Sequence, residues 1–487
     1  MKLSELTKEK EFDIIFEKFL FPLVGVPYGG FKKIQLTHDE NNHVKFNKDK
    51  NELLVFEELR GDSCLTIKVS KNFPNELVDL LNIAFVNIND IRHFNPKKIT
   101  KSTSYLQLLK NLDFCIEKSV ISWLCSDTVK AENIQFLLNS LEEWKSKTYE
   151  GKNVNFAFVV DITNKPKNEK DNNFYYLDFL NEEYSATITD GITSCILLDS
   201  NLNFVKYLST SSGTVIHDFK TGPLRFSDFI TNFVKDNIGV LLLGNGDLII
   251  AKNNGIKLVK REGKWLNFSK EVFSSYISAI LDKDNDLEFE NLVEEIYLSC
   301  LDVSFSHSGG IVAYILDKEV SNIVEPNIYA DLVQGVEIAK DAKQPIVHFI
   351  DNLSIGIKPY TELIELNPSY FDKKESKKRF LKREFLQKVI GNSSFKDLDR
   401  KLRCEIISMD GATIIKENGK FLSVGAIIQN DSGSYGGGRG AAARKLSNFG
   451  FAIKISTDGY IECYKKGDII FKIKWFVKGK CWFLHIL

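Results

Sequence analysis

The chain contains little methionine and little proline, and its charges almost cancel. Among 487 residues there are 2 Met and 10 Pro, and 64 Lys and Arg stand against 65 Asp and Glu. The low proline content fits compact domains without long proline-rich linkers. The balanced charge argues against a broadly basic nucleic-acid-binding surface, and a 43% hydrophobic content argues against a disordered chain.

Membrane-spanning and export segments are not indicated either. The longest apolar runs, such as Gly239–Leu243 and Val424–Ile428, are far shorter than the roughly 18 residues that span a bilayer. Residues 1–20 alternate charged and apolar positions, which is not the pattern of a secretory signal. We therefore expect a cytoplasmic protein that makes no use of a membrane.

The cysteines and histidines form no metal-binding motif. No Cys-x-x-Cys pair and no His-Glu-x-x-His motif occurs in the sequence. We expect reduced, mostly buried thiols. The eight cysteines are Cys64, Cys115, Cys125, Cys195, Cys300, Cys404, Cys463 and Cys481.

The first half of the chain mixes helical and strand patterns. Apolar spacing predicts helices at Leu77–Ala84 and Ile134–Lys145 and a buried strand at Phe156–Val160. Short strands separated by Asn-Gly and Glu-Gly turns then predict a β-meander that ends near Trp265, and Ser269 is expected to cap the next helix. The predicted domains are residues 1–115 (α+β), residues 116–282 (α+β with the meander) and residues 283–487.

The last domain alternates helices with strands, which predicts a mixed α/β fold with a mixed sheet flanked by helices. The basic run that begins at Lys373 precedes apolar residues at helical spacing, so it indicates the exposed start of an amphipathic helix and not a nucleic-acid site. The predicted helices are Leu287–Leu301, Lys373–Ile390, Phe395–Leu402 and one after the glycine-rich stretch; the predicted strands are Ile311–Leu316, Ser354–Ile357, Cys404–Ser408, Leu422–Ile428, Phe451–Ser456 and Tyr460–Tyr464.

The first candidate site is the sequence Met-Asp-Gly-Ala at residues 409–412, which follows the predicted strand Cys404–Ser408. A carboxylate at the end of an apolar strand, followed by a glycine that lets a substrate approach the backbone, suits a metal ligand beside a nucleotide. Asp410 is therefore a candidate metal ligand. An ordinary Asp-Gly turn is the alternative.

The second candidate site is a glycine-rich stretch that contains Gly436, Gly437 and Gly438, followed by Arg439 and an alanine-rich segment. Glycines that lead into a helix present unpaired backbone N–H groups, which together with an arginine favour phosphate binding. A flexible surface loop is the alternative. No Lys-Ser or Lys-Thr follows the glycines, which excludes a Walker A loop.

A dinucleotide-binding fingerprint is a further interpretation of the same stretch, because Gly436-x-Gly438-x-x-Ala441 is followed by Asp458. The loop that leads from Ile428 to Gly436 is too long for the tight turn of that motif, and too few residues follow Asp458 to complete a parallel sheet. Redox chemistry with NAD is therefore disfavoured.

The two candidate sites, in this order, resemble the motifs of the diadenylate cyclase domain family. In that family Asp-Gly-Ala is followed by Gly-Thr-Arg-His-Arg-Ala-Ala and by a strand that ends in Ser-Glu-Glu-Thr-Gly. The corresponding residues here are Asp410–Ala412, Gly437–Ala443 and Ser456–Gly459, and His307-Ser-Gly-Gly-Ile-Val-Ala-Tyr-Ile resembles the opening strand. The resemblance covers residues 287–473. The meander that ends at residue 265 is similar to the sensor region of a bacterial subgroup.

The resemblance implies a diadenylate-cyclase-like α/β domain that condenses two ATP molecules into cyclic di-AMP and two pyrophosphates with Mg²⁺ or Mn²⁺. Each protomer would hold one ATP, and a second protomer would face it. The sensor ligand is unknown. By the resemblance, Asp410 and Arg439 are catalytic and Asp410 binds the metal; the expected nucleotide-binding residues are Gly411, Ala412, Gly436, Gly437, Gly438, Gly440, Ala441, Ser456 and Arg444.

The chain differs from the family at the residues that would bind the triphosphate. Arg439-Gly440-Ala441 stands in place of Arg-His-Arg, and Asp458 alone stands in place of two glutamates. Each charge-assisted phosphate contact contributes about 1.5–3 kcal/mol, so losing two weakens the grip unless another group such as Arg444 replaces them. Arg444 can equally be a solvent-exposed helix residue. A nucleotide receptor that kept the cyclase fold is therefore the alternative function.

Overall fold

The computed structural model describes residues 20, 23, 31–35, 44–47, 49–50, 52–56, 63–68, 75–92, 105–125, 129–162, 188–210, 219–283, 286–316, 385–386, 388–390, 393–426, 428 and 437–473. The chain forms two compact units, Met1–Tyr276 and Ile277–Lys474. Division into residues 1–115, 116–282 and 283–487 stays a prediction. Within the described residues, no helix combines the length and the apolar character that a membrane span needs.

The first unit begins with a small antiparallel sheet and two long helices. Strand order is β1-β4-β3-β2, and helix α3 packs on β2. The side-chain amide of Asn82 on α3 accepts a hydrogen bond from the Val44 N–H (2.8 Å) and donates one to the Val44 carbonyl (3.0 Å), which fixes the helix to the strand. The elements are β1 (Phe31–Gln35), β2 (Val44–Asn47), β3 (Glu52–Phe56), β4 (Ser63–Lys68), α3 (Asn75–Arg92) and α4 (Tyr105–Leu124).

A seven-stranded sheet completes the first unit, in the order β13-β12-β11-β10-β7-β8-β9. Strands β7, β8 and β10 are buried along their whole length, as their continuous apolar sequences predict. The meander β10–β13 is confirmed. The elements are α5 (Ala131–Trp144), β5 (Thr148–Tyr149), β6 (Lys152–Asn153), β7 (Phe156–Val160), β8 (Ser194–Leu198), β9 (Phe204–Ser209), the short helices η5 (Leu224–Phe226) and η6 (Phe229–Val234), β10 (Ile238–Leu242), β11 (Leu248–Lys252), β12 (Gly255–Arg261) and β13 (Lys264–Leu266).

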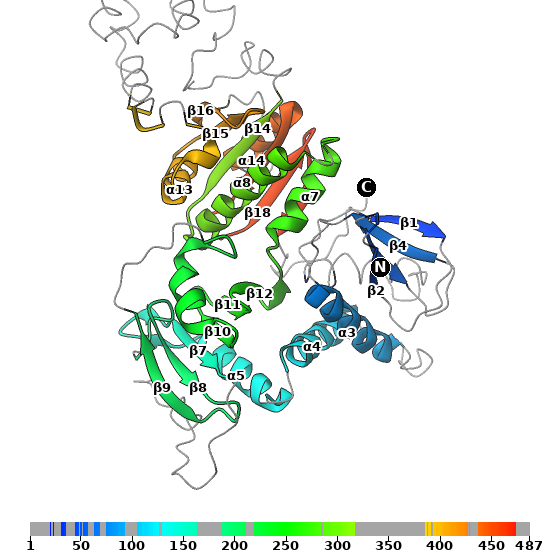
Figure 1. Ribbon diagram of the computed structural model, residues 1–487, viewed down its shortest axis with the longest axis vertical. Coiled ribbons are helices and arrows are strands. Elements are labelled where there is room, and N and C mark those ends of the chain that lie inside the picture. Colours follow the sequence, from blue (N-terminus) through cyan, green and yellow to red (C-terminus); the bar gives the residue numbers. More distant parts are fainter. Residues whose placement is uncertain are drawn as a thin grey trace, which may run out of the picture. The chain divides into compact units, whose positions relative to one another are not determined.

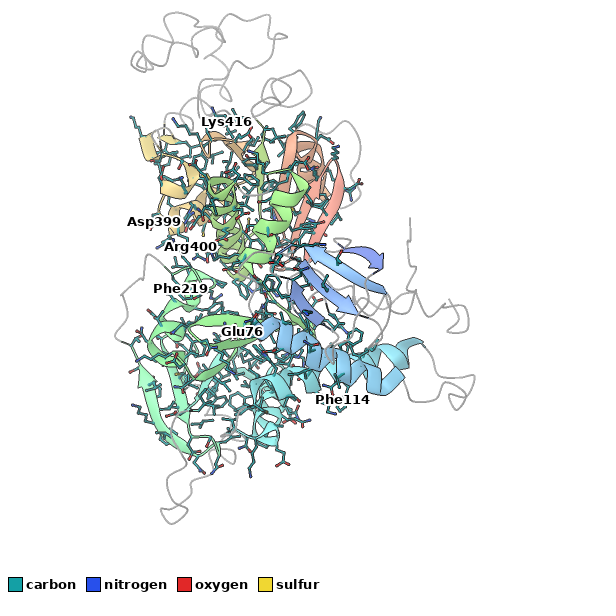
Figure 2. All side chains as sticks on the ribbon, turned by 45° about the vertical axis from the view of Figure 1, so that its right-hand side comes forward. Glu76, Phe114, Phe219, Asp399, Arg400 and Lys416 are labelled. Atoms are coloured by element: carbon teal, nitrogen blue, oxygen red, sulfur yellow. The ribbon has the colours of Figure 1, made fainter. Side chains whose placement is uncertain are left out.

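Ion pairs tie the meander together and to the helices. Arg261 Nη2 lies 2.7 Å from Asp247 Oδ2, and both side chains are almost completely buried. Lys257 pairs with Glu76 at the start of α3, which Figure 2 labels. Arg261 therefore has a structural partner inside its own sheet.

Helix α7 (Lys270–Ile280) begins as the sequence predicts. The Ser269 hydroxyl accepts a hydrogen bond from the Val272 N–H at 3.3 Å, so it caps the first turn. The division between the two compact units falls inside this helix, after Tyr276.

The second unit is a mixed six-stranded sheet with helices on both faces, as predicted (Figure 1). Strands β14 and β15 are parallel and all other neighbours are antiparallel, in the order β16-β15-β14-β17-β18-β19. The elements are α8 (Leu287–Phe305), β14 (Gly310–Ile315), η9 (Phe395–Asp397), α13 (Arg400–Ser408), β15 (Ala412–Lys416), β16 (Phe421–Ala426), α14 (Gly437–Leu446), η10 (Ser447–Phe449), β17 (Gly450–Ile455), β18 (Ile461–Lys465) and β19 (Asp468–Ile473).

The two faces of this sheet carry different helices. Ile311, Ala313 and Ile315 of β14 form one core with Ala443 and Leu446 of α14. The alternate residues face the other way, because side chains alternate along a strand. There the ring of Tyr314 contacts Phe289 of α8, and the Thr413 hydroxyl donates to the carbonyl of Ile406 in α13. The sheet therefore lies between α14 on one face and α8 with α13 on the other.

The predicted strand Cys404–Ser408 is wrong, because these residues form the second half of α13. The Asp399 carboxylate accepts hydrogen bonds from the N–H groups of Lys401 (2.9 Å) and Leu402 (3.3 Å) and so caps the helix. The buried face of α13 consists of Arg400, Arg403, Ile406 and Ile407. Since two of these are arginines, an apolar helical period is not visible in the sequence.

Other sequence predictions in this unit have mixed outcomes. Helix α8, strands β14, β16, β17 and β18 and the helix after the glycine-rich stretch are confirmed, with ends shifted by a few residues. The predicted helix Phe395–Leu402 is a short 3₁₀ turn followed by the start of α13, and strands β15 and β19 were not predicted. The predicted strand Ser354–Ile357 and most of the helix Lys373–Ile390 lie outside the described residues.

Replacing Gly411 and Gly440 by alanine should have opposite effects on stability. Gly411 has φ +101°, and an added Cβ would lie 2.6 Å from the Gly425 carbonyl oxygen and 2.7 Å from that of Ala426. We expect Gly411→Ala to cost roughly 2 kcal/mol or more through strain and overpacking. Gly440 lies in α14 with nothing within 4 Å of the added Cβ, so Gly440→Ala should stabilise by about 0.5–1 kcal/mol. Urea unfolding followed by circular dichroism measures both, and equal effects would contradict the packing described here.

Candidate functional site

The sheet of the second unit brings most of the predicted site residues together at one of its ends. Gly310, the first residue of β14, pairs with Ile455, the last of β17, and Ala412, the first of β15, pairs with Ala426, the last of β16. We call this the Gly310 end. Segments 306–309, 409–411 and 456–460 all connect elements there, although they are far apart in the sequence. Lys416, labelled in Figure 2, closes β15 at the opposite end.

Asp410 lies at the Gly310 end, but not at the end of a strand. It follows helix α13 and precedes β15, so the predicted strand-to-loop setting is wrong. Its side chain is exposed and makes no hydrogen bond or ion pair with any residue in the described part of the chain. The carboxylate is therefore available to an external ligand.

The structure gives a different reason for a glycine at position 411 from the one that the sequence suggested. The space beside its Cα is filled by the backbone of Gly425 and Ala426 in β16. The close approach that the glycine permits is therefore made by a neighbouring strand of the protein and not by a substrate. The glycine and the buried Ala412 fix the start of β15, and with it the position of Asp410.

Arg439 reaches the same end from the other face of the sheet. Helix α14 begins at Gly437, and its first turn exposes Gly437, Gly438 and Arg439. The guanidinium of Arg439 lies against Gly309: a Cβ built on that glycine would be only 2.8 Å from Arg439 Cζ. Any side chain at residue 309 would therefore displace the arginine. Gly436 lies outside the described residues.

The structure does not bring Arg444 to the Gly310 end. Its guanidinium lies 5.9 Å from the centre of the Tyr464 ring, and Tyr464 pairs with Ala452 near the opposite end of β17. Five residues of helix separate Arg444 from Arg439, which is about 7.5 Å along the axis. Burial and the neighbouring Glu462 carboxylate raise the pKa of Tyr464, so its hydroxyl stays protonated and donates to Glu462 at 2.7 Å.

Ser456 is at the Gly310 end, directly after β17. Its N–H donates to the Tyr460 carbonyl (2.8 Å) and its carbonyl accepts from the Gly459 N–H (2.9 Å), so it begins a tight turn. The Ser304 hydroxyl of α8 donates to the Gly459 carbonyl and holds this turn against the helix. The partly exposed Ser456 side chain can therefore be reached by a ligand.

The helix ends give the Gly310 end a polar gradient across the sheet. Helices α8 and α13 both end there on one face, and α14 begins there on the other. Carbonyl groups at a helix C-terminus favour cations, and N–H groups at a helix N-terminus favour anions. A cation is thus favoured on the side of Asp410, and an anion on the side of Arg439.

A divalent ion fits this arrangement only when substrate phosphates supply part of its ligands. No cluster of three or more His, Cys, Asp or Glu side chains able to hold a metal exists in the described ranges. Mg²⁺ keeps several waters and is commonly bound by one or two carboxylates together with substrate phosphates. Asp410 therefore suits an ion that arrives with a phosphorylated substrate and not one enclosed by the protein alone.

Two features of the site were not predicted from the sequence. One is Gly309, whose missing side chain makes room for Arg439. The other is a pair of hydroxyls, Ser308 Oγ and Ser408 Oγ, which lie 3.0 Å apart and join the ends of α8 and α13. Small residues directly before a strand were the available signal for both, but only the fold shows which elements they join.

Comparisons with known proteins give little. No protein-family model matches the chain, and no curated protein matches it. Among solved structures the chain is similar to the crystal structure of a double mutant of DacA from Staphylococcus aureus, with 16% identity over 39% of this chain and 91% of that chain and a TM-score of 0.20. This similarity is weak, so the interpretation of the site rests on the residues of the chain itself.

Anion binding should depend on Arg439 and not on Arg444. We expect Arg439→Ala to weaken the binding of inorganic pyrophosphate by about 1.5–3 kcal/mol, which is the contribution of a hydrogen bond to a charged group. Arg444→Ala is the matched control on the same helix, and it should leave the affinity unchanged because Arg444 lies over Tyr464. Calorimetry with pyrophosphate measures both. A larger loss for Arg444→Ala would contradict the placement of the anion site.

Proposed function

We propose that the second unit is a diadenylate-cyclase-like nucleotidyltransferase that condenses two ATP molecules into cyclic di-AMP with release of two pyrophosphates. The observation that carries the proposal is the position of Asp410 and Arg439 at the same end of the sheet, on its two sides, neither charge neutralised by a described residue. The resemblance of residues 410–412 and 437–443 to the motifs of that family supports the same assignment.

The reaction needs a carboxylate and an anion site close together. The 3′-oxygen of one nucleotide forms a bond to the α-phosphorus of the other, the bond from that phosphorus to the bridging oxygen breaks, and the hydroxyl proton passes to solvent. When bound, Mg²⁺ or Mn²⁺ would lower the pKa of the attacking hydroxyl and polarise the α-phosphate. Asp410 would hold the ion. Arg439 and the N–H groups of the first turn of α14 would neutralise the departing pyrophosphate, and Ser456 would donate to a phosphate oxygen.

A second protomer is part of the proposal. Each protomer would bind one ATP, so the two bonds of the cyclic product form only when two sites face each other. The exposed positions of Asp410, Gly437, Gly438 and Arg439 leave this end open to such an approach. The first unit would act as a sensor that controls the encounter, and its ligand is unknown.

The Arg439-Gly440-Ala441 sequence favours a second candidate function, a receptor for a cyclic or linear nucleotide. Without the second and third side chains of the family motif, the triphosphate is gripped by one arginine and by backbone N–H groups. A receptor tolerates that loss better than an enzyme does. A receptor has less need of the metal-binding carboxylate, so Asp410 favours the enzyme.

Product formation should depend on Asp410. We expect purified protein to convert ATP with Mn²⁺ into cyclic or linear dinucleotide, and Asp410→Asn to reduce the rate at least about a hundredfold because the variant loses the metal ligand. Asp468→Asn is the matched control, since Asp468 is an exposed carboxylate after β18 near the opposite end of the sheet. Chromatography of the products measures the rates.

The absence of any dinucleotide from wild-type protein, with or without candidate activators, would refute the enzymatic proposal. Calorimetry with cyclic di-AMP then tests whether the protein is a receptor. Tight binding that survives Asp410→Asn, together with no turnover of ATP, is the result expected of a receptor.

Restoring the family motif should raise activity. The double variant Gly440→His with Ala441→Arg supplies the two missing side chains, and no heavy atom lies within 4 Å of a Cβ at residue 440. We expect KM for ATP to fall by at least about tenfold, since a single new charge-assisted phosphate contact contributes about 1.5–3 kcal/mol. Gly440→Ala with Ala441→Gln is the uncharged control. Equal kinetics for the two double variants would show that ATP does not contact these positions.

A further inference from the structure

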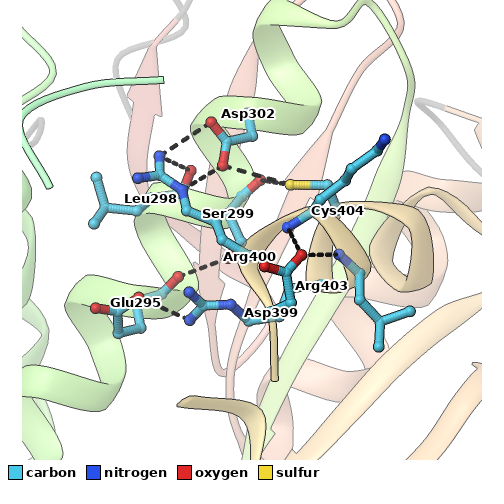
Figure 3. Close-up of polar contacts among 10 residues, drawn as sticks. Glu295, Leu298, Ser299, Asp302, Asp399, Arg400, Arg403 and Cys404 are labelled. Carbon is cyan, nitrogen blue, oxygen red and sulfur yellow. Dashed lines mark hydrogen bonds and ion pairs between the residues drawn. The ribbon is translucent and has the colours of Figure 1, made fainter. Parts of the chain in front are cut away.

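Helix α13 is attached to α8 at its first turn by a buried ion pair (Figure 3). Arg400 Nε donates to Asp302 Oδ2 at 2.6 Å and Arg400 Nη2 donates to Asp302 Oδ1 at 3.0 Å, so the contact is bidentate. The two side chains are 5% and 8% exposed. A bidentate contact between a guanidinium and a carboxylate fixes both distance and orientation.

The middle of α13 adds two further contacts to α8. Arg403 Nη1 lies 2.7 Å from Glu295 Oε2, and the Cys404 thiol donates to Asp302 Oδ2 at 3.4 Å. Burial, and then the Asp302 carboxylate, raise the pKa of the Cys404 thiol, so it stays protonated and can donate. Figure 3 shows these side chains pointing from α13 toward α8.

The last turn of α13 is attached at the Gly310 end. Ser408 Oγ lies 3.0 Å from Ser308 Oγ, and Ser308 Oγ lies 2.8 Å from Ser306 Oγ. An added Cβ on Gly310 would lie 2.7 Å from Ile407 Cγ2, so this turn also packs directly on the start of β14. Both ends of α13 are therefore held by α8 and by the segment that follows α8.

These contacts connect the two charges of the candidate site. Ser408 precedes Asp410 by two residues on one side of the sheet. Its partner Ser308 precedes Gly309, against which the guanidinium of Arg439 lies. The Ser308–Ser408 pair thus joins the segment that precedes Asp410 to the segment against which Arg439 lies.

Stability alone does not account for buried arginines on α13. Replacing a buried ion pair by apolar residues of similar size is often neutral or stabilising, because desolvation of the charges offsets their attraction. An apolar helix face would hold α13 with less directional constraint. Directional contacts at both ends are what a carboxylate needs if it must lie at a fixed distance from a phosphate site.

We propose that Arg400 and Ser408 are positioning residues, which through Asp302 and Ser308 keep Asp410 in place to hold a metal ion beside a nucleotide at Arg439. The proposal rests on the proposed function. It predicts that loss of the hydroxyl pair impairs metal-dependent nucleotide binding and turnover but leaves metal-free anion binding intact.

The test uses the full chain and the variants Ser308→Ala, Ser408→Ala and their combination. Calorimetry measures the affinity of α,β-methylene ATP with and without Mn²⁺, and the affinity of metal-free pyrophosphate. We expect the combination to weaken Mn²⁺-supported binding of the analogue about tenfold, with the two single variants each close to the combination, and to leave pyrophosphate binding unchanged. Ser299→Ala is the matched control, because that hydroxyl bonds only within α8, to the Glu295 carbonyl.

A second variant tests the other attachment. Arg400→Lys keeps the charge but loses the bidentate contact. Like the serine variants, it should weaken the Mn²⁺-supported binding of the analogue. Ser408→Thr keeps a hydroxyl and should restore most of the loss seen with alanine. Thermal unfolding by circular dichroism separates a variant that does not fold from one that folds with a displaced carboxylate, and only folded variants are compared.

The outcomes separate this inference from the proposed function. Equal loss of both kinds of binding, or no loss of either, would overturn the positioning role. The product assay of wild-type protein judges the cyclase proposal independently, because the calorimetric comparison needs no turnover.

Discussion

The parallel pairing of β14 and β15 is the constraint on which the site depends. Two parallel strands begin at the same end of a sheet, so the elements that precede them must end there as well. Helices α8 and α13 therefore deliver residues 306–309 and 409–411 to one place, although about a hundred residues separate them in the sequence. Antiparallel pairing of β17 with β14 then adds the end of β17 and the start of α14.

The chemistry of the site follows from this topology before any side chain is considered. Two helix C-termini on one face and one helix N-terminus on the other separate a region that favours cations from one that favours anions. Asp410 and Arg439 strengthen a polarity that the backbone already has. Glycines at 309, 310 and 411 allow the close packing that brings these elements together, since a Cβ at any of them would overlap a neighbouring group.

The sequence predicts local features better than long-range ones. The β10–β13 meander and buried strands such as β7 and β14 follow from turn residues and apolar patterns, and they are found where expected, whereas β15 and β19 were not predicted. The second half of α13 was predicted as a strand, because Arg400 and Arg403 lie on the buried face of the helix, where a pattern of apolar residues would normally appear. Their partners Asp302 and Glu295 are on another helix, so only the fold reveals that the arginines are neutralised. Arg444 was predicted either as a nucleotide-binding residue or as a solvent-exposed helix residue, and its distance from Arg439 along α14 takes it to Tyr464.

The glycine-rich start of α14 indicates how this chain could hold phosphate with so few charges. Glycine lowers helix stability by roughly 0.8–1 kcal/mol relative to alanine at each position, so three glycines in the first turn are unfavourable for the helix itself. They put no side chain beside the N–H groups of that turn, and no atom of the described residues outside the helix itself lies within 4 Å of a Cβ built at residues 437, 438 or 440. Backbone N–H groups carry only partial positive charges, so a metal ion is repelled by them less than by additional arginines. A site that relies on them can place an ion bound by Asp410 closer to the phosphates, which makes the position of that carboxylate more important here than in a site with three basic side chains.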